Sequence, residues 1–169
     1  MNFKFEVKEA KNGKGVFSKI SIKSGAIICY LLGTKKANHV IYRMLKTDKI
    51  GKDYPLQVKE NEYLVLKDPY VYFNHSCSPN SAVVERNKLI ATKDIAVGEE
   101  ITYDYSMVSL DETFEEKYEE WKMECDCGSS NCRKTIMDFH HLSKKEKQKA
   151  IKSKMLPDFI LNQYLSLEK

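Results

Sequence analysis

The chain has 169 residues, of which 42% are hydrophobic and 31% charged, and its formal net charge is +4. These values suit one soluble globular domain that buries a core of its own. Its longest apolar run, residues 26–32, is too short to span a membrane, and residues 1–15 lack the pattern of a secretory signal. We therefore expect an intracellular protein in a reducing compartment, the cytoplasm or the nucleus, with a secreted effector as the open alternative.

Short strands are predicted for the first two thirds of the sequence. Alternating or briefly apolar stretches favour strands at residues 3–9, 13–18, 24–33, 54–58 and 62–66, and two more within 87–105 that a turn at Gly98 separates. In this part only residues 38–46 favour a short helix.

Helices are predicted for the last third. Residues 109–124 form one candidate, with Ser109 and Glu112 or Thr113 and Glu116 as its capping box. A second helix is expected to begin after Ser143 and to end before the proline at position 157. Residues 158–167 are apolar enough to pack on the body, and residues 155–167 could form a dimer contact.

Charge is concentrated in two blocks. Residues 143–154 hold six lysines and one glutamate, whereas residues 109–126 hold eight acidic residues and two lysines. The basic block has no aromatic residues between its lysines and the chain has no zinc-finger spacing, so no direct nucleic-acid binding is expected. The acidic block could attract a basic substrate, and the basic block could fold onto it as an internal competitor. The alternative is that both blocks are solvent-exposed faces of helices and have neither role.

The cysteines predict a metal site. Cys125, Cys127 and Cys132 form a C-x-C-x4-C pattern, and five cysteines in a reducing compartment argue against a disulfide framework. A structural zinc site takes four ligands in a tetrahedron. Cys77, in the polar turn NHSCSPN, is a better fourth ligand than Cys29 in an apolar strand, because a turn can present its side chain to a distant loop. The alternative is three unrelated loop cysteines and two buried thiols.

Four ordered segments carry a family resemblance: NGKGVFS, YFNHSCSPN, GEEITYDY and CDCGSSNCR. Across residues 12–136, the chain resembles the SET-domain protein lysine methyltransferases with a post-SET zinc loop. The resemblance implies a mainly β, β-clip-like SET fold with a knot-like crossing and a helical C-terminal extension. The implied parts are a SET domain at 1–108, an acidic helix and post-SET zinc loop at 109–136, and the extension at 137–169, in one compact unit.

The resemblance also implies S-adenosylmethionine-dependent methyl transfer to a lysine ε-amine of a basic protein, such as a histone or a ribosomal protein. Tyr105 would be the catalytic tyrosine, and Tyr103 would favour monomethylation by narrowing the lysine site. The implied cofactor-binding residues are Asn12, Lys14, Gly15, Tyr54, Asn74, His75, Tyr105 and Ile136, and the implied zinc ligands are Cys77, Cys125, Cys127 and Cys132.

Such a reaction needs little specialised chemistry from the protein. The pKa of a lysine amine is about 10.4, so an apolar channel must favour the neutral form. Alignment of the reacting atoms then supplies most of the reduction in the activation barrier. Two alternatives stay open: TYDY as a strand of the core with His75 as a structural histidine, and a catalytically idle SET-like module that binds a protein partner through the same groove. The presence of Tyr105, Asn74 and His75 favours the enzyme.

Overall fold

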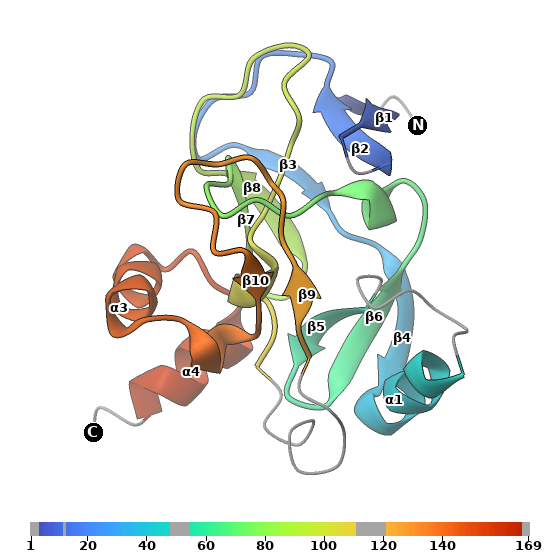
Figure 1. Cartoon of the computed structure of the whole chain (residues 1–169), viewed down its shortest axis with the longest axis vertical. Helices are drawn as coiled ribbons and strands as arrows, with labels where there is room; N and C mark the ends of the chain where they lie inside the picture. The colour runs from blue at the N-terminus through green and yellow to red at the C-terminus, as the bar shows by residue number, and fades with distance from the viewer. Residues whose placement is uncertain (1–3, 12, 48–54, 111–120, 167–169) are drawn as a thin grey trace.

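The fold is that of a computed structural model, which describes residues 4–11, 13–47, 55–110 and 121–166. Short strands occupy the centre of the molecule, with helix α1 on one side and α3 and α4 on the other (Figure 1). The α-helices described are α1 (Asn38–Lys46), α3 (Lys144–Ser153) and α4 (Asp158–Ser166). Three 3-10 helices accompany them, η1 (Tyr70–Tyr72), η2 (Tyr105–Met107) and η3 (Phe139–His141). No helix in these residues is both long enough and apolar enough to cross a membrane.

The strands form small antiparallel sheets rather than one large sheet. Two are pairs and two have three strands, in the orders β1-β2, β9-β10, β3-β8-β7 and β4-β6-β5. The strand bounds are β1 (Phe5–Ala10), β2 (Gly13–Ser18), β3 (Ile27–Tyr30), β4 (Gly33–Ala37), β5 (Pro55–Lys59), β6 (Glu62–Leu66), β7 (Ser81–Val84), β8 (Lys88–Ala91), β9 (Met123–Glu124) and β10 (Thr135–Ile136).

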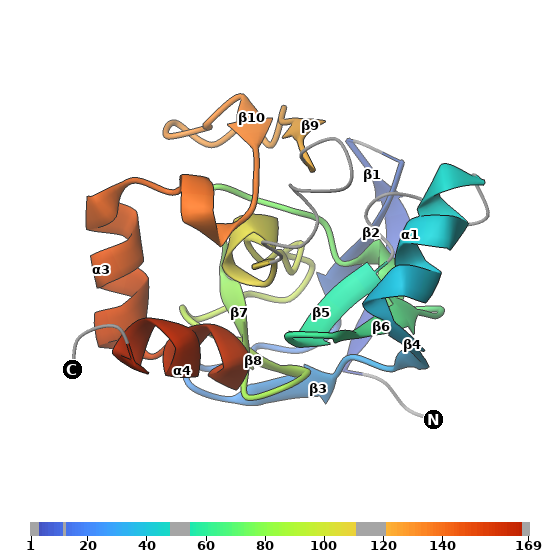
Figure 2. The ribbon, with the colours of Figure 1, turned by 90° about the horizontal axis from the view of Figure 1, so that it is seen from below.

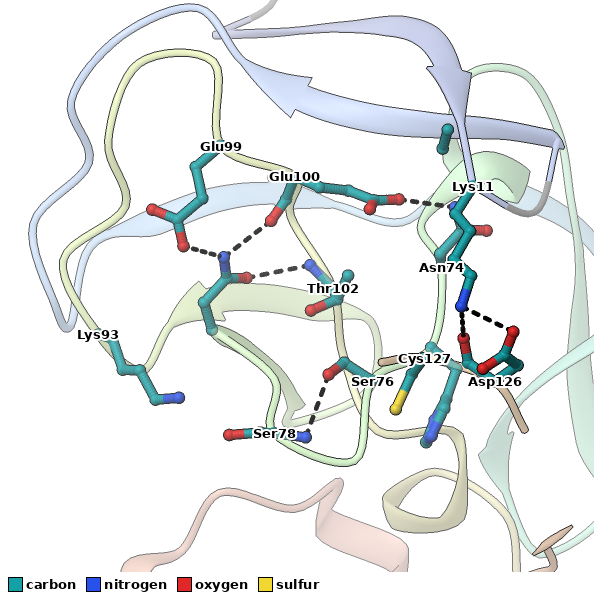
Figure 3. A pocket seen from close by; sticks show the side chains of 13 residues that line it. Lys11, Asn74, Ser76, Ser78, Lys93, Glu99, Glu100, Thr102, Asp126 and Cys127 are labelled. Atoms are coloured by element: carbon teal, nitrogen blue, oxygen red, sulfur yellow. Dashed lines mark hydrogen bonds and ion pairs between the residues drawn. The ribbon is translucent and has the colours of Figure 1, made fainter. Parts of the chain in front are cut away.

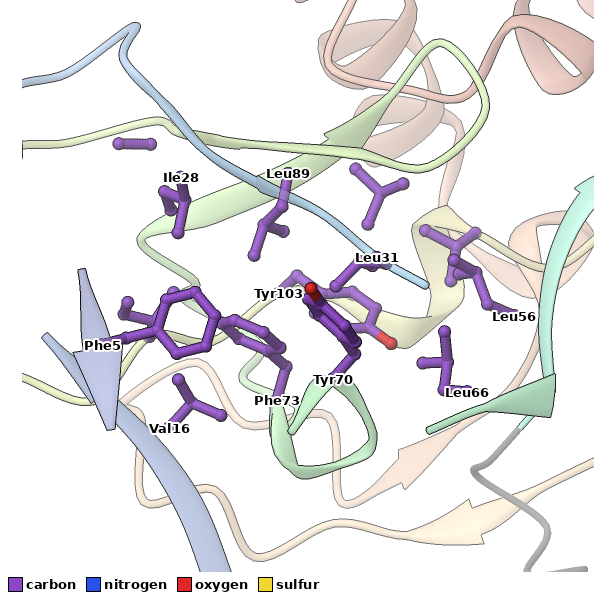
Figure 4. Packing of buried hydrophobic residues seen from close by; sticks show 14 of the residues in the cluster. Phe5, Val16, Ile28, Leu31, Leu56, Leu66, Tyr70, Phe73, Leu89 and Tyr103 are labelled. Atoms are coloured by element: carbon purple, nitrogen blue, oxygen red, sulfur yellow. The ribbon is translucent and has the colours of Figure 1, made fainter. Parts of the chain in front are cut away.

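The main core lies between these sheets (Figure 4). Each small sheet has one apolar face, and the faces bury one another because none could form a core alone. The rings of Phe5 and Phe73 meet edge to face, with centroids 5.2 Å apart. Tyr103 also belongs to this core and is 4% exposed. The core therefore reaches the segment expected to carry the catalytic tyrosine.

A second core holds the C-terminal helices. Its buried residues are Leu110, Phe139, Leu142, Ala150, Leu156, Phe159 and Ile160. The predicted capping box at the start of α3 is confirmed: the Ser143 hydroxyl accepts from the backbone N–H of Glu146, whose carboxylate accepts from the backbone N–H of Ser143. The apolar residues of 156–164 thus pack mostly within the chain. A dimer contact through 155–167 stays a prediction, as does the three-part division.

The sequence predicted much of this architecture, but several elements differ. The helix at 38–46 is confirmed. The predicted strand after Gly98 is wrong: residues 99–104 make only isolated bridges, at Glu100 and Tyr103, before η2 begins at Tyr105. Strands β4, β7, β9 and β10 were not predicted. Most of the predicted acidic helix at 109–124 lies outside the described residues, but its last two residues form strand β9 instead.

Candidate functional site

Two distant segments lie side by side at the site. His75, in the NHSC turn, and Tyr103 form a parallel bridge, with the Tyr103 N–H donating to the Asn74 carbonyl (3.2 Å) and the Ser76 N–H to the Tyr103 carbonyl (3.2 Å). Because a bridge fixes backbone positions, side chains from both segments are presented to the same place.

Tyr105 is held in a defined orientation. Its hydroxyl donates to the Phe73 carbonyl at 2.9 Å, and its ring lies 5.4 Å from the ring of His75 and 5.0 Å from that of Tyr103 (centroid distances). With its hydrogen engaged by Phe73, the hydroxyl oxygen can act toward a ligand only as an acceptor.

Gly15 and Asn74 bring strand β2 against the NHSC turn. The Asn74 amide donates to the Lys14 carbonyl at 3.0 Å and to the Glu100 carboxylate at 2.7 Å. A Cβ on Gly15 would lie 2.4 Å from Glu100 Oε1 and 2.9 Å from the Cβ of Ala10. Only glycine permits this approach.

A cavity of about 300 Å³ opens beside these residues (Figure 3). Lys11, from the turn after β1, spans its edge and pairs with the Asp126 carboxylate at 2.7 Å. A second cavity of about 120 Å³ shares Asn74, His75, Asp126 and Cys127 with the first. Tyr105, Met123 and Ile136 are among the other residues that line it. The two cavities form one groove that combines polar, charged and apolar groups, as a nucleoside joined to an amino acid would require.

The cysteines meet at one end of this groove. The Sγ atoms of Cys77 and Cys125 are 3.8 Å apart, and those of Cys125 and Cys132 are 3.6 Å apart. Zn–S bonds of about 2.3 Å in a tetrahedron place sulfurs about 3.8 Å apart, so both separations fit zinc. The ligand atoms of His75, Cys77, Cys125 and Cys127 also lie within 4.8 Å of one another. These five residues therefore offer two candidate sets of four.

The hydrogen bonds of His75 decide between the sets. The Tyr105 backbone N–H donates to His75 Nδ1 at 3.2 Å, which places the ring hydrogen on Nε2, 3.2 Å from the Cys77 sulfur. Burial, and then the positive charge of Arg133, lower the pKa of His75 to about 3, so the ring is neutral. A protonated Nε2 donates to a sulfur rather than binding a metal. This geometry favours Cys132 as the fourth ligand and gives His75 a supporting contact.

The thiols differ in their readiness to ionise. Burial raises the pKa of Cys77 and of Cys125. For Cys127 burial acts in the same direction, but hydrogen bonds from the Cys77 backbone N–H and with the Ser129 hydroxyl outweigh it and lower the pKa to about 6. Cys127 is therefore readier than Cys77 or Cys125 to begin metal binding, because the thiolate is the ligand.

The structure brings together most of the residues predicted for the site. Those placed at the groove, or bonded to residues that line it, are Lys14, Gly15, Asn74, His75, Tyr103, Tyr105, Ile136, Cys77, Cys125, Cys127 and Cys132. Asn12 and Tyr54 lie outside the described residues.

The sequence did not predict an ion pair behind the tyrosines. Arg133, directly after Cys132, places Nη2 2.5 Å from the Asp104 carboxylate and Nη1 3.7 Å from that of Glu146. In the sequence, Asp104 lies between Tyr103 and Tyr105. Its position in TYDY was visible, but nothing in the sequence paired it with a residue 29 positions away.

Comparisons with known proteins agree with this geometry. A family model described as "SET domain" matches residues 13–106. The variant-silencing SET domain-containing protein of Plasmodium falciparum is 34% identical over 156 residues, which cover 82% of this chain and 6% of that protein. The methyltransferase domain of human histone-lysine N-methyltransferase SETMAR gives a TM-score of 0.65 at 24% identity, over 82% of this chain and 59% of the other.

A structure of KRYPTONITE in complex with DNA, a histone H3(1-15) peptide and SAH gives a TM-score of 0.58 at 24% identity, over 80% of this chain and 30% of the other. The two structural likenesses show the fold, with SAH bound in one of these neighbours. The family match covers more than half of the chain and includes strand β2, the NHSC turn and both tyrosines. The chain belongs to the SET domain family.

Proposed function

We propose that this protein is a lysine methyltransferase that uses S-adenosylmethionine to methylate a basic protein, such as a histone. The observation that carries the proposal is the position of Tyr105, which lines the same groove as Asn74 and His75 and whose hydroxyl is held by the Phe73 carbonyl. A catalytically idle module would have no need for a tyrosine hydroxyl fixed at this point.

The cofactor would occupy the groove described above. When bound, S-adenosylmethionine supplies an electrophilic methyl group on a positively charged sulfur. Asn74 and the backbone around Lys14 and Gly15 would hold its amino-acid end, and Ile136 would cover the apolar face of its adenine. Polar groups line both cavities, whereas the apolar side chains of Met123 and Ile136 line only the smaller one, where they could contact the adenine.

The two tyrosines would position the substrate lysine. A lysine that enters between aromatic rings loses hydration, which lowers the pKa of its ammonium and favours the neutral amine. The Tyr105 oxygen, limited to accepting, would orient the amine and the methyl group. Tyr103 is buried in the core and its ring lies 5.0 Å from that of Tyr105, so the space beside the amine is small. We therefore expect monomethyl-lysine as the main product.

Zinc would have a structural role. Cys77, Cys125, Cys127 and Cys132 would bind it, and the separations of the Cys125 sulfur from those of Cys77 (3.8 Å) and Cys132 (3.6 Å) match a tetrahedral zinc site. Such a site would tie the C-terminal loop to the NHSC turn and so form one wall of the groove.

Two of the similar proteins support the choice of substrate. SETMAR is named a histone-lysine N-methyltransferase, and the KRYPTONITE structure holds a histone H3 peptide. This chain spans a small part of the Plasmodium relative and about three fifths of the SETMAR structure, so its own substrate must be measured.

The test is methyl transfer from labelled S-adenosylmethionine to separate panels of core histones and ribosomal proteins, followed by mass spectrometry of the labelled lysine. The expected result is one labelled protein with monomethyl-lysine. A product dominated by trimethyl-lysine would contradict the role of Tyr103, and no transfer despite cofactor binding would favour the partner-binding module.

A further inference from the structure

Helix α3 carries a row of lysines along one exposed face. Lys145, Lys149 and Lys152 are all exposed and follow the spacing i, i+4 and i+7, which places them on the same side of the helix. Lys144 and Lys154 are exposed at the two ends. We call Lys145, Lys149 and Lys152 the lysine face. The helix lies at the edge of the molecule in both views, so this face is not covered by another described element (Figure 2).

The remaining charges of α3 are already engaged. Glu146 caps the helix through Ser143 and lies 3.7 Å from Arg133. Lys147 donates to the His140 carbonyl at 2.5 Å. Within the part of the chain that the structure describes, no ion pair involves a residue of the lysine face. Among the described residues the lysine face therefore has no acidic partner, and an anionic ligand would complement it.

The rest of the helix narrows the choice of partner. Ala150 and Ile151 pack in the C-terminal core, so α3 has no apolar face with which to enter a membrane. The exposed residues between the lysines are Gln148 and Ser153, and neither can stack on a base as single-strand binding requires. From Lys145 to Lys152 the row is about 10 Å long. This length covers about three phosphates of one strand of a duplex, at about 3.4 Å of helix axis each.

We propose that the lysine face of α3 binds the phosphate backbone of duplex nucleic acid without reading its sequence. This departs from the expectation drawn from the sequence, which rested on the absence of aromatic residues and of a zinc finger. Those absences argue against contacts to bases. They do not argue against contacts to phosphates, which supply most non-specific affinity.

Fluorescence anisotropy of the zinc-loaded full chain with a short labelled DNA duplex of mixed sequence tests the proposal. Three phosphate contacts predict a slope of about −2.7 for log affinity against log salt concentration, or about 40-fold weaker binding at 200 mM than at 50 mM salt. In the variant Lys145→Gln/Lys149→Gln/Lys152→Gln the slope should fall towards zero. An RNA duplex measured in parallel identifies which backbone is preferred, and tight binding of either supports the proposal.

The control is Lys19→Gln/Lys59→Gln/Lys67→Gln, which removes the same charge from exposed positions elsewhere and should keep the wild-type slope. Equal slopes in the two variants would overturn the proposal, since only net charge would then matter. Single-stranded DNA that binds as tightly as the duplex, or poly-glutamate that binds instead of it, would also overturn it. No methyl transfer is involved, so the result is independent of the proposed enzymatic activity.

Discussion

The guanidinium of Arg133 lies 2.5 Å from the carboxylate of Asp104. This ion pair joins the loop that carries Cys125, Cys127 and Cys132 to the segment that carries Tyr103 and Tyr105. Asp104 is 6% and Arg133 19% exposed. Asp104 also accepts from the backbone N–H of Ser106 and so caps η2, which begins at Tyr105. Thus one buried ion pair couples the last cysteine of the loop to the backbone that positions Tyr105.

Arg133→Met should destabilise the protein strongly, because it leaves the Asp104 carboxylate buried without its partner. We expect a loss of about 3–5 kcal/mol in the free energy of unfolding, measured by urea denaturation. The double variant Arg133→Met/Asp104→Asn should recover part of the loss. Glu146→Gln is the control: its carboxylate is 40% exposed and lies 3.7 Å from Arg133, so its removal should cost less than about 1 kcal/mol. Equal losses for Arg133→Met and Glu146→Gln would show that the buried ion pair stabilises the protein no more than the exposed one does.

Zinc analysis should separate metal ligands from supporting residues. The purified chain is expected to hold one zinc ion, and Cys132→Ser should abolish stoichiometric binding. Loss of the Nε2 donor in His75→Phe should leave the site intact but weaken zinc affinity by about 10- to 100-fold. Cys29→Ser is the control, since burial raises the pKa of Cys29 to about 12 and its side chain packs against the main core, away from the other cysteines. Full zinc content in Cys132→Ser with none in His75→Phe would make histidine the fourth ligand.

Gly15→Ala should damage the cofactor groove. The added Cβ would lie 2.4 Å from Glu100 Oε1, 2.9 Å from the Cβ of Ala10 and 3.1 Å from the Asn74 amide nitrogen. These groups must therefore shift, and Asn74 belongs to the NHSC turn that lines the groove. We expect a loss of about 1–3 kcal/mol in stability and a clear drop in S-adenosylmethionine affinity, measured by calorimetry. Gly25→Ala offers a comparison, because Gly25 has a positive φ of 83° and no atom within 4 Å of an added Cβ. That variant should lose stability while it keeps cofactor affinity; loss of affinity in both would argue against a local effect.

Leu156→Ala tests whether the C-terminal helices belong to the folded unit. Leu156 is fully buried in the second core, so the cavity should cost about 2–5 kcal/mol in one cooperative unfolding transition. Leu165→Ala, at a position that is 46% exposed on α4, should cost little. A separate early transition in the wild type, affected only by Leu156→Ala, would instead indicate an independent extension.

Local patterns predicted the elements whose residues fix their own conformation. The helix α1 follows from its apolar spacing, and α3 follows from the Ser143 and Glu146 capping box. Strand β4 escaped prediction because its sequence, GTKKA, is polar and depends on pairing with β6. The strand expected at TYDY was wrong because Tyr103 pairs with His75, a partner far away in the sequence, and Asp104 then caps a 3-10 turn.

Some features of the candidate site could be predicted from the sequence and others could not. Its cysteines, glycine and tyrosines were recognisable because their residue types and order are distinctive. The hydrogen bond from the Tyr105 backbone to His75 and the ion pair of Asp104 with Arg133 were not, because each depends on how distant segments meet. These contacts determine the tautomer of His75 and the charged partner of Asp104, and neither can be read from the order of residues in the sequence.

Methyl transfer by wild-type protein beside Tyr105→Phe tests the central claim most directly. Both zinc-loaded proteins would be given labelled S-adenosylmethionine and the identified substrate, with cofactor binding measured by calorimetry. We expect lysine labelling by the wild type and loss of that labelling in Tyr105→Phe. Cofactor affinity should be unchanged, because the variant lacks only the hydroxyl that donates to the Phe73 carbonyl. Undiminished transfer in Tyr105→Phe would contradict the assigned role of Tyr105, and absence of cofactor binding in both proteins would contradict the proposed function itself.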